Sequence, residues 1–249
     1  MLGAIIGEIV GSKWEFDPTN DYDFEMFSEE NSFTDDTVCT IAVADAIING
    51  RDYGKSIHEW CRRYPSPMGG YGGRFNEWVM SDTTKPYDSF GNGSAMRVSP
   101  VAWHFNNVEE VLREARLTAA CKHNHPEGIR GAEATALAIF ECRQGRDISA
   151  AVEYAGYDIN INKVDVENRF DETCQGTVPV AFWIINNSSS FEDAIRRAVS
   201  LGADADTLGA IVGSIAEARW GIPDDIRKKA LEYLPKEMKN VIDKFGDIN

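Results

Sequence analysis

Residues 34–50 read TDDTVCTIAVADAIING and carry the signals of a helix with an acidic first turn. Val38, Ile41 and Ala42 recur at steps of three and four residues, the spacing that places side chains on one helix face. Thr34 and the two aspartates stand where side-chain oxygens cap free amides and complement the positive end of the helix dipole. Gly50 follows where a glycine ends a helix. The stretch therefore predicts a helix over residues 34–49.

The same helical period recurs along most of the chain, and strand-like alternation is scarce. Further helices are predicted over residues 108–121, 131–143, 191–201 and 206–219, and residues 224–245 predict a polar-faced helix or a helix pair interrupted at Pro235. Propensity alone favours a strand at residues 177–185, TVPVAFWII, although an apolar run of this length has no period that separates a strand from a buried helix. The sequence as a whole predicts an all-α protein.

Two stretches lack any period. Residues 11–33 are polar and aromatic, and residues 64–94 contain the glycine-rich segments PSPMGGYGGRF and SFGNGS. Long irregular loops in compact domains are usually functional or disordered. The segment around Tyr71 is a candidate for closing over a ligand.

Length and charge narrow the class of protein. A chain of 249 residues without a low-complexity linker favours one domain, residues 1–249. The 40 acidic and 25 basic residues give a net charge of −15, which argues against non-specific nucleic-acid binding and against anionic membrane surfaces. An excess of carboxylates fits a protein that holds divalent cations.

Cysteine usage and the first residues bear on the compartment. Five cysteines without paired short spacing indicate reduced thiols rather than a disulfide framework. The opening MLGAIIGEIVG is short and is interrupted by Glu8, so it supports neither a signal peptide nor a membrane span. We expect a cytoplasmic protein.

Two acidic clusters open two of the predicted helices. Asp35 and Asp36 stand at one helix start, and Asp204 and Asp206 stand at another. Capping is the simpler explanation for such residues, but it accounts for one or two side chains per helix and not for both neighbouring acids. Carboxylate and hydroxyl oxygens are the ligands that Mg²⁺ prefers and Mn²⁺ accepts. If the two starts meet, four carboxylates crowd together and bound cations offset their repulsion.

Other segments carry weaker signals. Gly209 and Gly213 lie four residues apart in a predicted helix, which indicates close approach to another helix. Residues 91–97, GNGSAMR, fit either a phosphate-cradling loop or a tight turn. Residues 121–127 contain Cys and His, but their spacing does not match a structural zinc site. Taken alone, Glu15 reads as a surface acid.

Together these segments resemble the ADP-ribosylglycohydrolase family over nearly the whole chain and in the family's order. The matching segments are residues 3–15 (GAIIGEIVGSKWE), 33–37 (FTDDT), 91–97 (GNGSAMR), 123–127 (HNHPE) and 200–207 (SLGADADT). The two Asp motifs at opposite ends of the chain are the most specific part of the resemblance. The resemblance implies a compact single-domain orthogonal helical bundle, all-α, with a helix at residues 177–185.

The resemblance also implies a site with two divalent cations, Mg²⁺ or Mn²⁺. The implied metal ligands are Thr34, Asp35, Asp36, Asp204, Asp206 and Thr207. The implied catalytic residues are Glu15, Asp35 and Asp206. The implied ligand-binding residues are Asn92, Gly93, Ser94 and His123, with the backbone of Gly93 and Ser94 near a pyrophosphate and His123 near the distal ribose.

Three features depart from the family pattern. Glu8 stands where the family usually has Asp, Gly202-Ala203 stands where it usually has two glycines, and the chain is short. None of these changes removes an implied metal ligand. The short length leaves the identity of the substrate open.

The expected function is metal-dependent hydrolysis of the glycosidic bond between ADP-ribose and a modified protein, nucleobase or small molecule, by a monomer. The transition state of such a reaction resembles an oxocarbenium ion. Three alternatives stay open: a module that binds ADP-ribose without cleaving it, a two-metal phosphohydrolase, and a protein whose acids only cap helices. Glu15 and the metal-site aspartates are all candidates for the general base.

Overall fold

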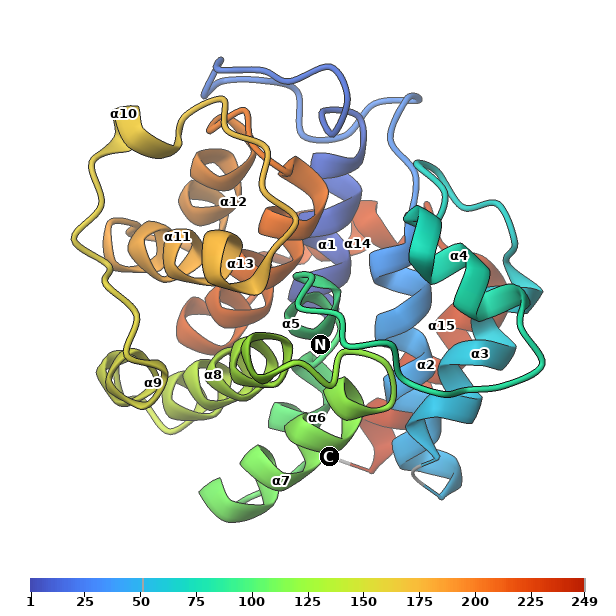
Figure 1. The fold of residues 1–249 in the computed structure, drawn as a ribbon. Helices are drawn as coiled ribbons and strands as arrows, with labels where there is room; N and C mark the ends of the chain where they lie inside the picture. Colours follow the sequence, from blue (N-terminus) through green and yellow to red (C-terminus); the bar gives the residue numbers. More distant parts are fainter. Residues whose placement is uncertain (51, 249) are drawn as a thin grey trace.

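A computed structural model describes residues 1–50 and 52–248, and these residues form helices, turns and loops without a β-strand (Figure 1). A single isolated bridge pairs Gly91 with Thr173. The all-α expectation is confirmed. The helices in chain order are α1 (Leu2–Ser12), α2 (Asp35–Asn49), α3 (Tyr53–Arg63), α4 (Gly73–Met80), α5 (Gly93–Met96), α6 (Ser99–His104), α7 (Val108–Ala120), α8 (Pro126–Arg143), α9 (Ser149–Ala155), α10 (Lys163–Val166), α11 (Cys174–Asn186), α12 (Phe191–Val199), α13 (Ala205–Trp220), α14 (Asp224–Leu231) and α15 (Lys236–Asp247).

The helices predicted from periodicity are present. In α2, the Thr34 side chain accepts a hydrogen bond from the Asp36 amide, and Gly50 ends the helix with a left-handed φ of 119°. Of the two alternatives for the tail, the structure has the helix pair, α14 and α15, with Pro235 at the N-cap of the second helix. Helix α8 starts at Pro126, earlier than predicted, because the ring of His125 accepts a hydrogen bond from the Glu127 amide and caps the start.

The strand favoured by propensity at residues 177–185 is wrong, because this run lies within α11. Thr173 caps the helix by accepting a hydrogen bond from the Gly176 amide at 3.0 Å. The helix is buried on almost every side, among α8, α12 and α13. Its sequence is therefore apolar throughout and shows no helical period. The β-branched and aromatic residues then make the strand propensity of this run higher than its helix propensity.

The glycine-rich stretch at residues 64–94 is less irregular than predicted. It contains α4, which starts directly after Gly72 and buries Phe75 and Trp78. The hydroxyl of Tyr71 donates to the carbonyl oxygen of Tyr64 at 2.6 Å and so ties the segment to the end of α3. In this structure the segment packs on the protein.

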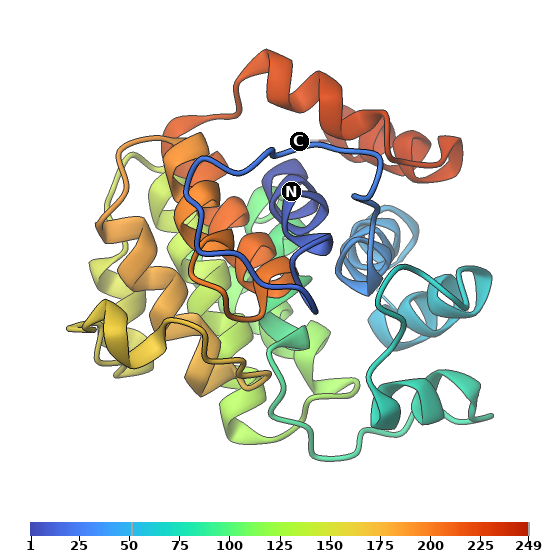
Figure 2. The ribbon, with the colours of Figure 1, turned by 90° about the horizontal axis from the view of Figure 1, so that it is seen from above.

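Helices α1 and α13 run against each other at the centre of the molecule with their backbones in contact (Figure 2). A Cβ built on Gly7 would lie 1.9 Å from the carbonyl oxygen of Gly209. A Cβ on Gly213 would lie 2.1 Å from the carbonyl oxygen of Gly3. Since no side chain fits at these distances, glycine is required at this crossing. The close helix approach predicted from Gly209 and Gly213 is thereby confirmed, and its partner is α1.

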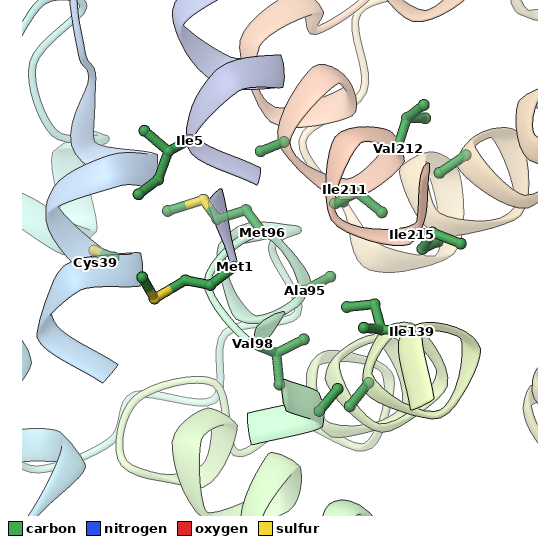
Figure 3. Packing of buried hydrophobic residues seen from close by; sticks show 14 of the residues in the cluster. Met1, Ile5, Cys39, Ala95, Met96, Val98, Ile139, Ile211, Val212 and Ile215 are labelled. Carbon is green, nitrogen blue, oxygen red and sulfur yellow. The ribbon is translucent and has the colours of Figure 1, made fainter. Parts of the chain in front are cut away.

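The buried core joins α1, α2, α5, α8 and α13. Ile5 of α1, Met96 of α5, Ile139 of α8 and Ile211 of α13 point toward the same interior (Figure 3). This shared packing fixes the start of α2 relative to the start of α13. Among the described residues, no helix is both long enough and apolar enough to cross a bilayer.

Candidate active site

The two acidic helix starts, far apart in sequence, lie side by side in the fold. The hydroxyl of Thr34, before α2, donates to Asp206 at 3.2 Å. In return the hydroxyl of Thr207, on α13, donates to Asp36 at 3.3 Å. The spatial convergence that the hypothesis of a shared site requires is therefore present.

The carboxyl groups at this junction are crowded and removed from water. Asp36, Asp204 and Asp206 are buried, and Asp35 is half-buried. Burial, followed by the charge of Asp206, raises the pKa of Asp35 to about 7 and raises the pKa of Asp36 well above its usual range. Burial likewise raises the pKa of Asp204 and of Asp206. Burial and mutual repulsion therefore favour the protonated form of each of these groups.

Glu8 adds a further acid from α1. It is completely buried, and it accepts hydrogen bonds from the amide of Thr34 and the hydroxyl of Thr37. Burial raises its pKa well above the usual range. Its contacts tie α1 to the first turn of α2, so Glu8 positions the first Asp motif.

The donor set suits a hard divalent cation. All the groups at the junction offer oxygen, the ligand type that Mg²⁺ and Mn²⁺ take. The Oδ2 atom of Asp36 is buried and has no hydrogen-bond partner among the described residues, and burial and the charge of Asp206 raise the pKa of Asp35 and Asp36. Within residues 1–50 and 52–248, no group of three His, Cys, Asp or Glu side chains has the geometry of a metal site. The aspartates instead bond to the neighbouring threonines and to Asn92.

Glu15 lies at the rim of the acidic junction, in the loop after α1. It is half-buried, and burial, together with the charges of Asp206 and Asp35, raises its pKa to about 8. A Cβ on Gly69 would lie 2.6 Å from a Glu15 carboxyl oxygen, so the glycine-rich segment borders this acid. Glu15 therefore lies close to the two Asp motifs and is not the isolated surface acid that it resembles in the sequence alone.

The glycine loop at residues 91–94 lies directly beside Asp204. The side-chain amide of Asn92 donates to Asp204 at 2.7 Å and to Thr177 at 3.1 Å. The Ser94 hydroxyl is buried and donates to the Gly128 carbonyl at 2.6 Å. Both side chains thus hold the loop in place. Gly93 and Ser94 begin α5, and the first amides of a helix have no intrahelical acceptor.

His123 faces this loop in a defined tautomer. Its Nε2 atom lies 3.4 Å from the position of a Cβ on Gly93. Its Nδ1 atom lies 3.2 Å from the guanidinium of Arg97, which only donates, so Nδ1 accepts and Nε2 carries the hydrogen. Burial and the charge of Lys122 lower the pKa of His123 well below its usual range, which keeps the ring neutral. The imidazole therefore offers an N–H donor beside the loop.

A cavity of about 690 Å³ adjoins Asp204. Asp204 and Thr177 line it together with apolar residues of α11 and α13, such as Val180 and Leu208. Its volume falls in the range of small-molecule sites. Asp204 therefore stands between the acidic junction, the glycine loop and an open volume.

These features define a class: an all-α protein in which two distant acidic helix starts form one site beside a glycine loop. A sequence profile of the ADP-ribosylglycohydrolase family matches residues 1–248. The chain belongs to the ADP-ribosylglycohydrolase family.

Known relatives agree with this assignment. The chain is 26% identical to ADP-ribosylarginine hydrolase Tri1 of Pseudomonas putida, with 100% of this chain and 78% of the relative covered. It is 25% identical to the ADP-ribosyl-[dinitrogen reductase] glycohydrolase of Rhodospirillum rubrum, with 97% and 90% covered. A solved structure, an ADP-ribosylglycohydrolase-related protein complex, shares the fold with a TM-score of 0.74 at 22% identity over 99% of this chain and 95% of that one.

Three residues of the site were not given a role by the sequence alone. Arg97 is completely buried, and it orients His123 while donating to the carbonyl oxygen of Thr118 at 2.9 Å. Thr177 supports Asn92 from α11. Lys122 is buried beside His123. The only local signal for such a role in the sequence was a charged residue within a run of apolar or small residues, as at Arg97.

Proposed function

We propose that the chain hydrolyses the glycosidic bond between ADP-ribose and an acceptor, and that it does so with two Mg²⁺ or Mn²⁺ ions. The observation that carries this proposal is the junction of Asp35 and Asp36 with Asp204 and Asp206, where four carboxyl groups crowd together and bound cations would offset their repulsion. Membership of the family supports the reaction class.

The residues that would hold the ions are those at the two helix starts. They are Thr34, Asp35, Asp36, Asp204, Asp206 and Thr207. When bound, the cations would orient the ribose hydroxyls and polarise a water molecule. The threonine hydroxyls and the Asn92 amide already fix the aspartates, which lowers the cost of ordering them for the ligand.

Glu15 is our candidate for the general base. Asp36, Asp204 and Asp206 accept hydrogen bonds from neighbouring side chains. In the described part of the chain, the Glu15 carboxyl has no such hydrogen bond. A pKa raised to about 8 suits proton transfer near neutral pH. Glu15 would accept a proton from the water that attacks the anomeric carbon, while the bond from this carbon to the acceptor breaks and the acceptor leaves with the electron pair and takes up a proton. Asp35 and Asp206 would balance the charge of the cations.

The glycine loop would bind the pyrophosphate. The amides of Gly93 and Ser94 at the start of α5 have no intrahelical acceptor, and the Nε2–H of His123 lies beside Gly93. Neutral donors of this kind bind phosphate oxygens without a buried counter-charge. Binding energy from this remote group would hold the anomeric carbon at the acidic junction.

A panel of defined conjugates tests the activity. ADP-ribose attached to arginine, to serine, to a nucleobase and to an acetyl group would be incubated with the protein and Mg²⁺ or Mn²⁺. We put arginine first, since a relative is named ADP-ribosylarginine hydrolase. The expected product is free ADP-ribose from at least one conjugate. Release of inorganic phosphate instead would favour a phosphohydrolase, and tight binding without any product would favour a binding module.

A further inference from the structure

The cavity of about 690 Å³ beside Asp204 lies between the segment that joins α9 to α11 and the helices α11 and α13 (Figure 1). Of the described residues that we propose to bind cations or ADP-ribose, only Asp204 lines it. The glycine loop and His123 do not. Since Asp204 belongs to the junction that would hold the distal ribose, the part of the substrate next to the cavity is the group attached to the anomeric carbon. This group is the acceptor.

The walls of the cavity are largely apolar, and the charge within them is negative. Val180 of α11 and Leu208 of α13 contribute aliphatic surface. The charged residues of the wall, among those described, are Asp158, Arg169, Asp171 and Asp204. Asp158 and Arg169 are exposed, so water and salt screen their charges. Asp171 is half-buried and Asp204 is buried. The charge that a ligand meets away from water is therefore that of a carboxylate.

The carboxyl group of Asp171 is held in a defined position. Its Oδ1 atom accepts hydrogen bonds from the amide of Thr173 at 2.9 Å and from the hydroxyl of Thr173 at 2.6 Å. A Cβ on Gly176 would lie 2.2 Å from its Oδ2 atom, so the group fits because residue 176 has no side chain. In the part of the chain that the structure describes, Asp171 makes no ion pair. A fixed carboxylate in the wall of a cavity is thus left available to a cation.

A series of hydrogen bonds links Asp171 to Asp204. The hydroxyl of Thr177 donates to the carbonyl oxygen of Asp171 at 2.8 Å and accepts a hydrogen bond from the Asn92 amide at 3.1 Å. The same amide donates to Asp204 at 2.7 Å. The two residues therefore have a fixed relative position in one cavity wall. A substrate with its ribose at Asp204 can extend its acceptor along this wall to Asp171.

We propose that this cavity is the acceptor subsite, and that Asp171 selects an acceptor with a cationic nitrogen group on an aliphatic stem, such as the guanidinium of an arginine side chain. The inference rests on the proposed function, because it needs ADP-ribose at the acidic junction. A guanidinium keeps its charge and its planar set of donors when one nitrogen carries the ribose, and it pairs with a carboxylate. Val180 and Leu208 pack against the stem. A serine oxygen or an acetyl ester has no charge and gains nothing from Asp171.

The test measures kcat/KM of the full chain for ADP-ribosylarginine and ADP-ribosylserine conjugates. Asp171→Asn removes the charge and keeps an oxygen that accepts from Thr173. Gly176→Ala is a second variant, because the added Cβ displaces the Asp171 carboxyl group without removing its charge. Asp165→Asn is the matched control, since it removes an exposed charge from α10 in the same segment and does not line the cavity. Calorimetric titration with ADP-ribose alone reports on the rest of the site, also where the serine conjugate is not cleaved.

We expect Asp171→Asn to lower kcat/KM for the arginine conjugate about 10-fold or more, mainly through KM, which is the scale of one hydrogen bond to a charged group. Gly176→Ala should change it in the same direction. The serine conjugate, the affinity for ADP-ribose and the Asp165→Asn control should each change less than about twofold.

Three results would overturn the subsite. The first is an unchanged kcat/KM for the arginine conjugate in Asp171→Asn. The second is an equal loss for both conjugates or a loss of affinity for ADP-ribose, because Asp171 would then only support Asn92 through Thr177. The third is a wild-type chain that prefers the serine conjugate, which would leave the proposed function standing. Failure of the wild-type chain to release ADP-ribose from any conjugate would instead overturn the proposed function.

Discussion

The hydroxyl of Thr207 donates to Asp36 across 3.3 Å and joins two helix starts that lie 171 residues apart in the chain. This contact exists because α1 brings the two helices together. Glu8 of α1 binds the first turn of α2, and Gly7 of α1 lies against Gly209 of α13. The geometry of the site thus depends on a helix crossing that contributes no ligand of its own.

The close contact between α1 and α13 leads us to expect that one added methyl group lowers the stability of the protein strongly. Gly7→Ala would place a Cβ 1.9 Å from the carbonyl oxygen of Gly209, and overpacking of this kind costs about 1–3 kcal/mol or more. We expect a clear drop in the midpoint of thermal unfolding, measured by circular dichroism. Gly246→Ala on α15, where nothing lies within 4 Å, is the control and should be neutral or stabilising by up to about 1 kcal/mol. Equal behaviour of the two variants would show that the helices are not in backbone contact.

The acidic junction predicts a pH dependence of stability in the metal-free protein. Burial raises the pKa of Asp35 to about 7 and that of Glu15 to about 8, whereas the unfolded carboxyls titrate near about 4. The folded state therefore binds more protons, and this contribution to stability is complete below about pH 4 and is lost as the pH rises through about 7 to 8.

In chelator, the midpoint of thermal unfolding should consequently fall between pH 6 and pH 8.5. With Mg²⁺ or Mn²⁺ the fall should be smaller, because the cation supplies the missing charge. A midpoint in chelator that rises over this range would contradict the raised pKa values.

Removal of one carboxylate should stabilise the metal-free protein while it abolishes the response to metal. Asp36→Asn keeps the shape of a buried side chain and removes a carboxyl group whose ionisation is opposed by burial and by the charge of Asp206. We expect the midpoint in chelator to rise, by roughly 2–4 °C per kcal/mol gained in a chain of this size. The shift on addition of Mn²⁺ should shrink or vanish. Asp243→Asn, on the exposed surface of α15, serves as a control that should change neither quantity.

The neutral imidazole of His123 predicts a binding defect that is independent of pH. His123→Ala removes an N–H donor beside the glycine loop and should raise KM about 10-fold with a smaller change in kcat. The ratio of mutant to wild-type KM should stay constant from pH 6 to pH 8, because the ring carries no charge over this range. His58→Ala, whose ring contacts Trp78 on α4, is the control. A ratio that grows toward pH 6 would show that the imidazole binds as a cation.

Helices with a clear local sequence pattern could be predicted, but the contacts between these helices could not. The caps and periods of α2 and α13 identified both acidic helix starts, and Gly209 and Gly213 indicated a close helix partner. The identity of that partner depends on Gly3 and Gly7, whose helix is apolar on most of its faces. No local pattern shows that the two acidic helix starts lie together in space. That expectation came from the resemblance to a family.

The remaining differences follow from burial. Propensity favours a strand at residues 177–185 because α11 is apolar on almost every side, so its sequence has no helical period. The roles of Arg97 and Lys122 arise from partners far away in sequence, such as Thr118 and Phe75. A buried charge cannot be distinguished from a surface charge until the tertiary structure places it.

The most direct test of the central claim is the release of free ADP-ribose from the best conjugate of the panel, measured with Mg²⁺, with Mn²⁺ and with chelator, for the wild-type chain, Asp35→Asn and Asp206→Asn. We expect turnover by the wild type with either ion, loss of turnover in chelator with recovery on re-addition, and at least about 100-fold lower turnover by each variant, whose helical signal persists. Undiminished turnover in chelator, together with undiminished turnover by both variants, would contradict the assignment of this acidic junction as the metal-dependent active site.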